Sequence, residues 1–176
     1  TVGMTDGSDI SAISMSPGLG LDAWTATAGF NTNNGAIFWM NPARGPSGSD
    51  IAMAQLTMPS ALDGSASGVV QGRPTEGSDD WQSVVTWSWT GGGGTPPPPP
   101  QIDLATSVTT YSATGVDGMT TYRLLLSLPA SASNVYAFAG TPLGDLAMPP
   151  AYQVASPFGA DIGGVSPALS AVMAAA

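Results

Sequence analysis

Residues 84–89 (VVTWSW) decide the fold class of this chain of 176 residues. The odd-numbered positions, one valine and two tryptophans, share one face of an extended strand because side chains alternate along a strand. The even-numbered positions place a valine, a threonine and a serine on the other face. One apolar face and one hydroxyl-rich face are typical of an antiparallel sheet that covers a core on one side only.

Short segments of similar character recur between turns that are rich in Gly, Pro, Asn and Asp. The strands expected besides 84–89 are residues 1–4, 10–15, 23–28, 36–40, 51–58, 67–71, 102–113, 120–128, 135–139 and 151–155. Residues 36–40 (AIFWM) are apolar without interruption, which predicts burial on both faces. Residues 102–113 and 120–128 predict a hairpin, and residues 168–176 are the one helix candidate. The sequence therefore predicts an all-β, antiparallel β-sandwich, Ig-like in general architecture.

Residues 91–100 (GGGGTPPPPP) predict a linker, since glycines are flexible and consecutive prolines favour a polyproline II rod of ~3.1 Å per residue. The alternative is a proline-rich surface loop. Contiguous prolines in a hydroxyl-rich, lysine-free chain also predict hydroxylation and O-glycosylation in an algal or plant-like secretory pathway. The expected acceptors are Thr95, Pro96, Pro97, Pro98, Pro99 and Pro100.

The charge composition excludes several classes of function. Twelve acidic residues stand against three arginines, and the net charge of −9 disfavours nucleic acid and anionic membrane surfaces as partners. No apolar run reaches the ~20 residues of a membrane-spanning helix. A surface that is polar through hydroxyl groups suits an extracellular or cell-surface protein.

The absence of histidine, cysteine and lysine removes the usual general bases, nucleophile partners and soft metal ligands. The carboxylate pairs Asp6/Asp9 and Asp79/Asp80 lie in turns, where aspartate normally caps the backbone. No EF-hand spacing supports calcium, and nothing in the sequence brings Glu76 to an aspartate as a glycosidase requires. We therefore expect no enzyme activity, cofactor or metal.

Tryptophan is the one residue type that suggests a ligand. Trp87 and Trp89 share a strand face and form a candidate aromatic platform for a sugar. The alternative is that both pack between the sheets, with their indole N–H groups bonded to backbone carbonyls.

Several motifs resemble a module that is repeated in large extracellular proteins of algae and other protists and is associated with surface fibrils such as mastigonemes. The motifs are Thr1-Val2-Gly3, Thr5-Asp6-Gly7, Ala36-Ile37-Phe38-Trp39-Met40-Asn41-Pro42, Gly45-Pro46-Ser47-Gly48, Ala54-Gln55-Leu56-Thr57, Val70-Gln71-Gly72, Asp80-Trp81, Thr121-Tyr122-Arg123-Leu124, Val135-Tyr136-Ala137, Pro149-Pro150-Ala151-Tyr152-Gln153-Val154 and Pro157-Phe158-Gly159. The two half-modules stand in reversed order here. The resemblance implies that residues 1–90 are the back half of one module and residues 101–176 the front half of the next, within an excerpt of a longer chain or a mature product.

The resemblance implies a structural subunit of an extracellular filament or cell-surface coat, whose partners are copies of itself in a linear or helical polymer. The alternative is a secreted carbohydrate-binding or adhesive module. Two arrangements of the halves are open at this point. The expected arrangement is strand sharing between successive copies, in which each half pairs with the complementary half of another copy; the alternative is that the halves of one chain pair as a permuted domain.

Overall fold

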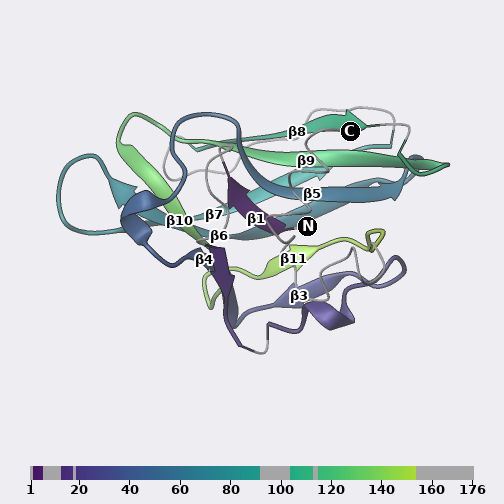
Figure 1. Cartoon of the computed structure of the whole chain (residues 1–176), viewed down its shortest axis with the longest axis horizontal. Coiled ribbons are helices and arrows are strands. Elements are labelled where there is room, and N and C mark those ends of the chain that lie inside the picture. The colour runs from purple at the N-terminus through teal and green to yellow at the C-terminus, as the bar shows by residue number, and fades with distance from the viewer. Residues whose placement is uncertain (1, 6–12, 18, 92–103, 113–114, 154–176) are drawn as a thin grey trace.

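The computed structural model describes residues 2–5, 13–17, 19–91, 104–112 and 115–153. Within these residues the chain forms two antiparallel sheets packed face to face (Figure 1). In the described ranges, regular helix is limited to two short 3-10 helices, η2 (Leu21–Ala23) and η3 (Pro42–Arg44). The predicted all-β antiparallel sandwich is confirmed.

The first sheet has four strands in the spatial order β1-β5-β9-β8. Their bounds are β1 (Val2–Thr5), β5 (Ile51–Pro59), β8 (Ala105–Ser112) and β9 (Met119–Ser127). β8 and β9 form the predicted hairpin, in register from Ala105 opposite Ser127 to Ser112 opposite Thr121. The alternating residues of β5 and β9 bury one face of this sheet completely, including Ile51, Leu124 and Leu126.

The second sheet has seven strands in the order β2-β4-β10-β6-β11-β3, and β7 pairs with β6. Their bounds are β2 (Ile13–Met15), β3 (Phe30–Thr32), β4 (Gly35–Trp39), β6 (Gly64–Pro74), β7 (Trp81–Trp89), β10 (Ala132–Gly140) and β11 (Leu146–Met148). β7 pairs with one edge of β6, and both β10 and β11 pair with its other edge. β4 then pairs with β10, and β3 pairs with β11. β3 with β4, and β10 with β11, therefore act as two long strands, interrupted at residues 33–34 and 141–145.

Each sheet combines strands from both halves of the chain. β5 from residues 1–90 pairs with β9 from residues 101–176, and β10 from the second half lies between β4 and β6 from the first. The halves therefore pair with each other within one chain, as in the permuted-domain alternative. The expected pairing with a neighbouring copy is not what this structure has, because the chain itself supplies the missing strands.

Aromatic rings on the core side of the second sheet lie against glycines of β6. Trp89 lies on Gly64, and Phe138 lies on Gly68, so tightly that an added Cβ at either glycine would overlap the ring. Trp81 covers Gly72 in the same way. Glycine at every fourth position of β6 thus makes room for large rings in the gap between the sheets, where a larger residue would push them apart.

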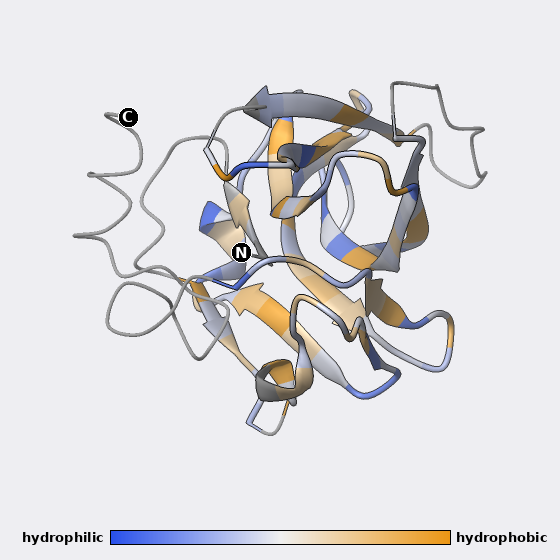
Figure 2. Ribbon diagram, turned by 90° about the vertical axis from the view of Figure 1, so that its right-hand side faces the viewer, coloured by the Kyte–Doolittle hydropathy of each residue, from blue (hydrophilic) through white to orange (hydrophobic). Residues whose placement is uncertain are grey.

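Three of the strand predictions are wrong. Residues 151–153, the described part of the predicted strand 151–155, are not in a strand. Residues 36–40 are not buried on both faces: Ile37 and Trp39 face the core, Phe38 is half-buried on the outer face, and Met40 is 67% exposed. Residues 23–28 form the end of η2 and a turn, in which the Thr25 hydroxyl accepts a hydrogen bond from the Ala28 backbone N–H. The distribution of hydrophobic residues along the strands can be followed in Figure 2. The helix candidate 168–176 lies outside the described residues.

Candidate functional site

The predicted aromatic platform is wrong, because both of its tryptophans are in the core. Trp87 is 0% and Trp89 5% exposed. Trp87 packs edge-on against Phe138, with ring centroids 5.7 Å apart, and Trp89 packs against Tyr122 at 5.5 Å. These residues hold the two sheets together and present no ring to a sugar.

The indole N–H groups follow the expectation for buried tryptophan in part. Trp87 Nε1 donates across the sandwich to the Leu125 carbonyl at 2.8 Å, as predicted. Trp39 does the same toward Met4, at 3.0 Å. Among the residues that the structure describes, the buried Nε1 of Trp89 has no hydrogen-bond partner.

The carboxylates of the loop between β6 and β7 are held by neighbouring hydroxyls. Ser78 Oγ donates to Asp79 at 3.4 Å, and the Tyr136 hydroxyl donates to Asp80 at 2.7 Å. Burial, followed by the hydrogen bond to Asp80, raises the pKa of Tyr136 to about 12, so this phenol is a fixed donor at neutral pH. Across the described part of the chain, no group of three His, Cys, Asp or Glu residues is placed to hold a metal ion.

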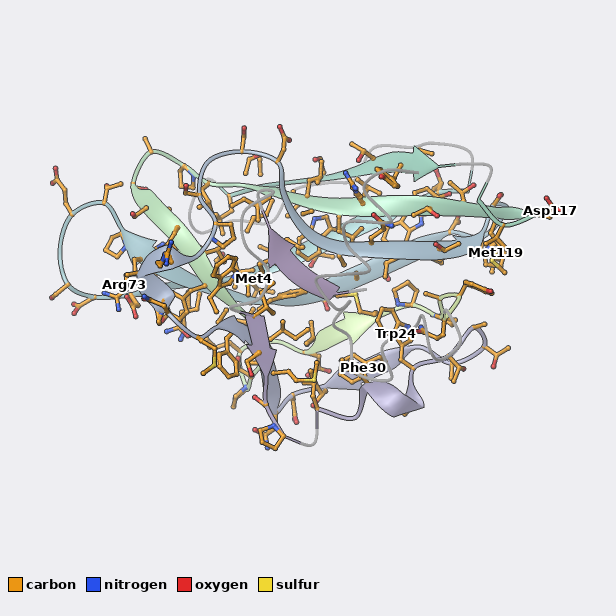
Figure 3. All side chains as sticks on the ribbon, in the orientation of Figure 1. Met4, Trp24, Phe30, Arg73, Asp117 and Met119 are labelled. Carbon is orange, nitrogen blue, oxygen red and sulfur yellow. The ribbon has the colours of Figure 1, made fainter. Side chains whose placement is uncertain are left out.

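Charged residues are segregated from the faces of the sandwich. In the part of the chain that the structure describes, no strand contains an aspartate or a glutamate, and the only charged residues within strands are Arg73 of β6 and Arg123 of β9. Asp22 lies in η2, and the other acidic residues in the described ranges lie in turns and loops: Asp50, Asp63, Glu76, Asp79, Asp80, Asp117 and Asp145. In Figure 3 Asp117 marks one end of the long strands and Arg73 lies toward the other. The broad faces of both sheets are thus free of carboxylates.

The outer face of the seven-stranded sheet has one apolar row between rows that include polar residues. The apolar row of cross-strand neighbours runs from Ala36 through Ala139 and Val69 to Val84, and the next row holds Phe38 and Ala137 together with Ser14, Gln71 and Gln82. The loop at residues 141–145 lies over Val69 and Val84, which are 3.4–3.5 Å from the position of a Cβ added to Gly144. Val84 remains 42% and Leu143 66% exposed. We call Ala36, Phe38, Val84, Ala139 and Leu143 the apolar outer face.

The outer face of the four-stranded sheet is polar and carries Arg123. Gln55, Arg123 and Thr109 are direct neighbours across β5, β9 and β8. A bulge in β8 between Thr110 and Ser112 brings Tyr111 to Arg123, whose guanidinium carbon lies 3.6 Å from the centre of the tyrosine ring. The Thr57 and Thr121 hydroxyls of the next row are 2.9 Å apart. We call Gln55, Thr57, Thr109, Tyr111, Thr121 and Arg123 the polar outer face.

Sequence reasoning missed the polar outer face. The alternation of apolar and polar residues in β9 places Arg123 away from the core, so its outward position could have been predicted from the sequence. The bulge that turns Tyr111 toward Arg123 has no signature in the sequence of β8. Of the other predicted site residues, Thr95, Pro96, Pro97, Pro98, Pro99 and Pro100 lie outside the described residues, as do Asp6 and Asp9.

No model of a known protein family matches this chain, and no curated protein or solved structure matches it either. The resemblance to a repeated module of surface-fibril proteins therefore stays a prediction. In the part of the chain that the structure describes, we find no helix with the length and apolar character needed to cross a membrane.

Proposed function

We propose that the protein is a structural subunit of an extracellular filament or cell-surface coat, in which copies of the chain contact one another through the apolar outer face. The proposal has no enzymatic component. The observation that carries it is the segregation of charge: the strands of the described ranges contain no carboxylate, although the chain has a net charge of −9.

Charge decides which surfaces of two copies can meet. Copies with a net charge of −9 repel one another at long range, and the repulsion is strongest where carboxylates approach. In the described residues the carboxylates lie outside the strands, so a contact between apolar outer faces keeps most of them apart; Asp145, two residues from Leu143 in the loop over Val69 and Val84, is the exception. Other arrangements, such as end-to-end contact, would bring the acidic turns together.

Hydrophobic burial supplies the attraction. Phe38, Val84 and Leu143 retain exposed surface on one face, and the neighbouring Ala36 and Ala139 are also only partly buried. Apolar surface removed from water contributes roughly 25 cal/mol per Å², and contiguous exposed apolar patches commonly mark interaction sites. A second copy is a suitable occupant because its own apolar outer face has no charged side chain in the row from Ala36 to Val84 and exposes the same apolar residues.

In the proposed assembly, copies contact one another through the apolar outer face and do not share strands between half-modules. Each chain closes its own sandwich and then packs against others. The expected extracellular location fits a surface that is polar mainly through hydroxyl and amide groups.

Sedimentation velocity and negative-stain electron microscopy test the proposal. Wild-type protein should form concentration-dependent polymers, whereas Val84→Lys, which places a charge in the apolar outer face, should stay monomeric. Ser78→Lys is the matched control, because it adds the same charge at an exposed loop position. A monomeric wild-type protein at high concentration, or polymerisation of Val84→Lys equal to that of Ser78→Lys, would contradict the proposed interface.

A further inference from the structure

We propose that the polar outer face binds an acidic polysaccharide, with Arg123 recognising a sulfate or carboxylate group of the polymer. Arg123 is one of only three basic residues in the chain. Its described contacts are with neutral groups: its Nε donates to Gln55 Oε1 at 3.2 Å, and its guanidinium plane covers the Tyr111 ring. These contacts orient the guanidinium without neutralising its charge.

This orientation leaves the recognition edge of the guanidinium for a ligand. Two N–H fork nitrogens remain once Nε is bonded, and such a fork matches the two oxygens of a carboxylate or sulfate. Stacking on Tyr111 and the bond to Gln55 restrict the arginine in advance, which lowers the entropy lost when a ligand binds. Tyr111 is 44% exposed, so the pair is accessible from solvent.

The groups around Arg123 favour a sugar polymer. Thr109, in register beside Arg123, is exposed, and in the next row the half-buried Thr57 shares a hydrogen bond with the hydroxyl of the buried Thr121. Hydroxyl and amide groups both donate and accept hydrogen bonds, as sugar hydroxyls do. A single cation suits a polymer with isolated anionic groups, whereas nucleic acid would need clustered cations to displace its counterions.

No acidic side chain of the polar outer face would repel an anionic ligand bound at Arg123. The outward positions of the polar outer face include no aspartate or glutamate, and the described carboxylates lie outside the strands. Arg123 is therefore the dominant charge of this face. The site is on the four-stranded sheet, so it does not depend on the proposed contact through the seven-stranded sheet.

Affinity electrophoresis in gels that contain a sulfated galactan, a polyuronate or a neutral galactan tests the proposal with the whole chain. Wild-type protein should be retarded by one of the two acidic polymers, and retardation should fall as salt is raised. Arg123→Gln should weaken the affinity about tenfold or more, since hydrogen bonds to charged groups are among the stronger ones. Arg44→Gln, at an exposed position of η3, removes the same charge elsewhere and should bind as wild type.

A second variant tests the same site in case Arg123→Gln fails to fold. Thr109 is exposed, so Thr109→Glu should fold normally while placing a carboxylate beside Arg123, and it too should abolish retardation. Retardation by the sulfated polymer, the polyuronate or both supports the proposal and identifies the anion. Equal retardation by the neutral polymer, no retardation of wild-type protein, or an equal loss in Arg44→Gln would overturn it.

Discussion

Two phenylalanines on neighbouring strands should differ sharply in their contribution to stability. Phe138 of β10 is 0% exposed, lies on Gly68 and contacts Trp87 edge-on, so Phe138→Ala removes a full ring from the core. Loss of burial together with the cavity left behind should cost about 3–5 kcal/mol. That is a large share of the ~5–15 kcal/mol by which a domain is normally stable.

Phe38→Ala is the matched control, because Phe38 is half-buried on the opposite face of the same sheet, beside Ala137. Only part of its ring leaves water on folding, so its removal from the monomer should cost about 1 kcal/mol, below the ~1.5–3 kcal/mol of full burial. Urea unfolding followed by tryptophan fluorescence measures both values, at concentrations that keep the protein monomeric. An equal or larger loss in Phe38→Ala, with unchanged dependence on urea, would show that the assignment of the two faces is wrong.

Three further predictions address the core, a phenol and the linker. Gly68→Ala should destabilise the fold by about 1–3 kcal/mol, because its Cβ would overlap the Phe138 ring, and urea unfolding should detect the loss. Tyr136 should titrate near its pKa of about 12, which ultraviolet absorbance should detect. Its contribution to stability should be present below pH ~10 and be lost as the pH rises through 12. Asp80→Asn should lower the pKa of Tyr136, because it removes the carboxylate that accepts the hydrogen bond of the phenol. If Pro96–Pro100 are glycosylated, the intact mass of material from the native source should exceed the 17.5 kDa of the bare polypeptide, and a mass equal to it would contradict the modification.

Local alternation was sufficient to predict the most regular parts of the fold. Residues 84–89 alternate strictly, and in β7 they do place both tryptophans in the core and Val84 outside. The hairpin of β8 and β9 follows from two alternating segments joined by a short turn, which needs no distant partner. The sandwich class could therefore be read from the sequence.

Features that depend on distant partners could not be predicted. Residues 36–40 were expected to be buried on both faces because an uninterrupted apolar run does not reveal that one face is left without a covering layer. Likewise, no local pattern indicates that β11 continues the line of β10 along β6, since residues 141–145 separate them. In the candidate site, the outward position of Arg123 was predictable from the alternation in β9. Its contact with Tyr111 was not, because that contact depends on the bulge in β8.

Electron cryomicroscopy of the assembled native material tests the central claim most directly. It should show β5 of each chain paired with β9 of the same chain, and neighbouring copies in contact through the apolar outer face, including Val84 and Phe38. A map in which β9 completes the sheet of a different copy, or in which Val84 and Phe38 face solvent throughout the assembly, would contradict the account.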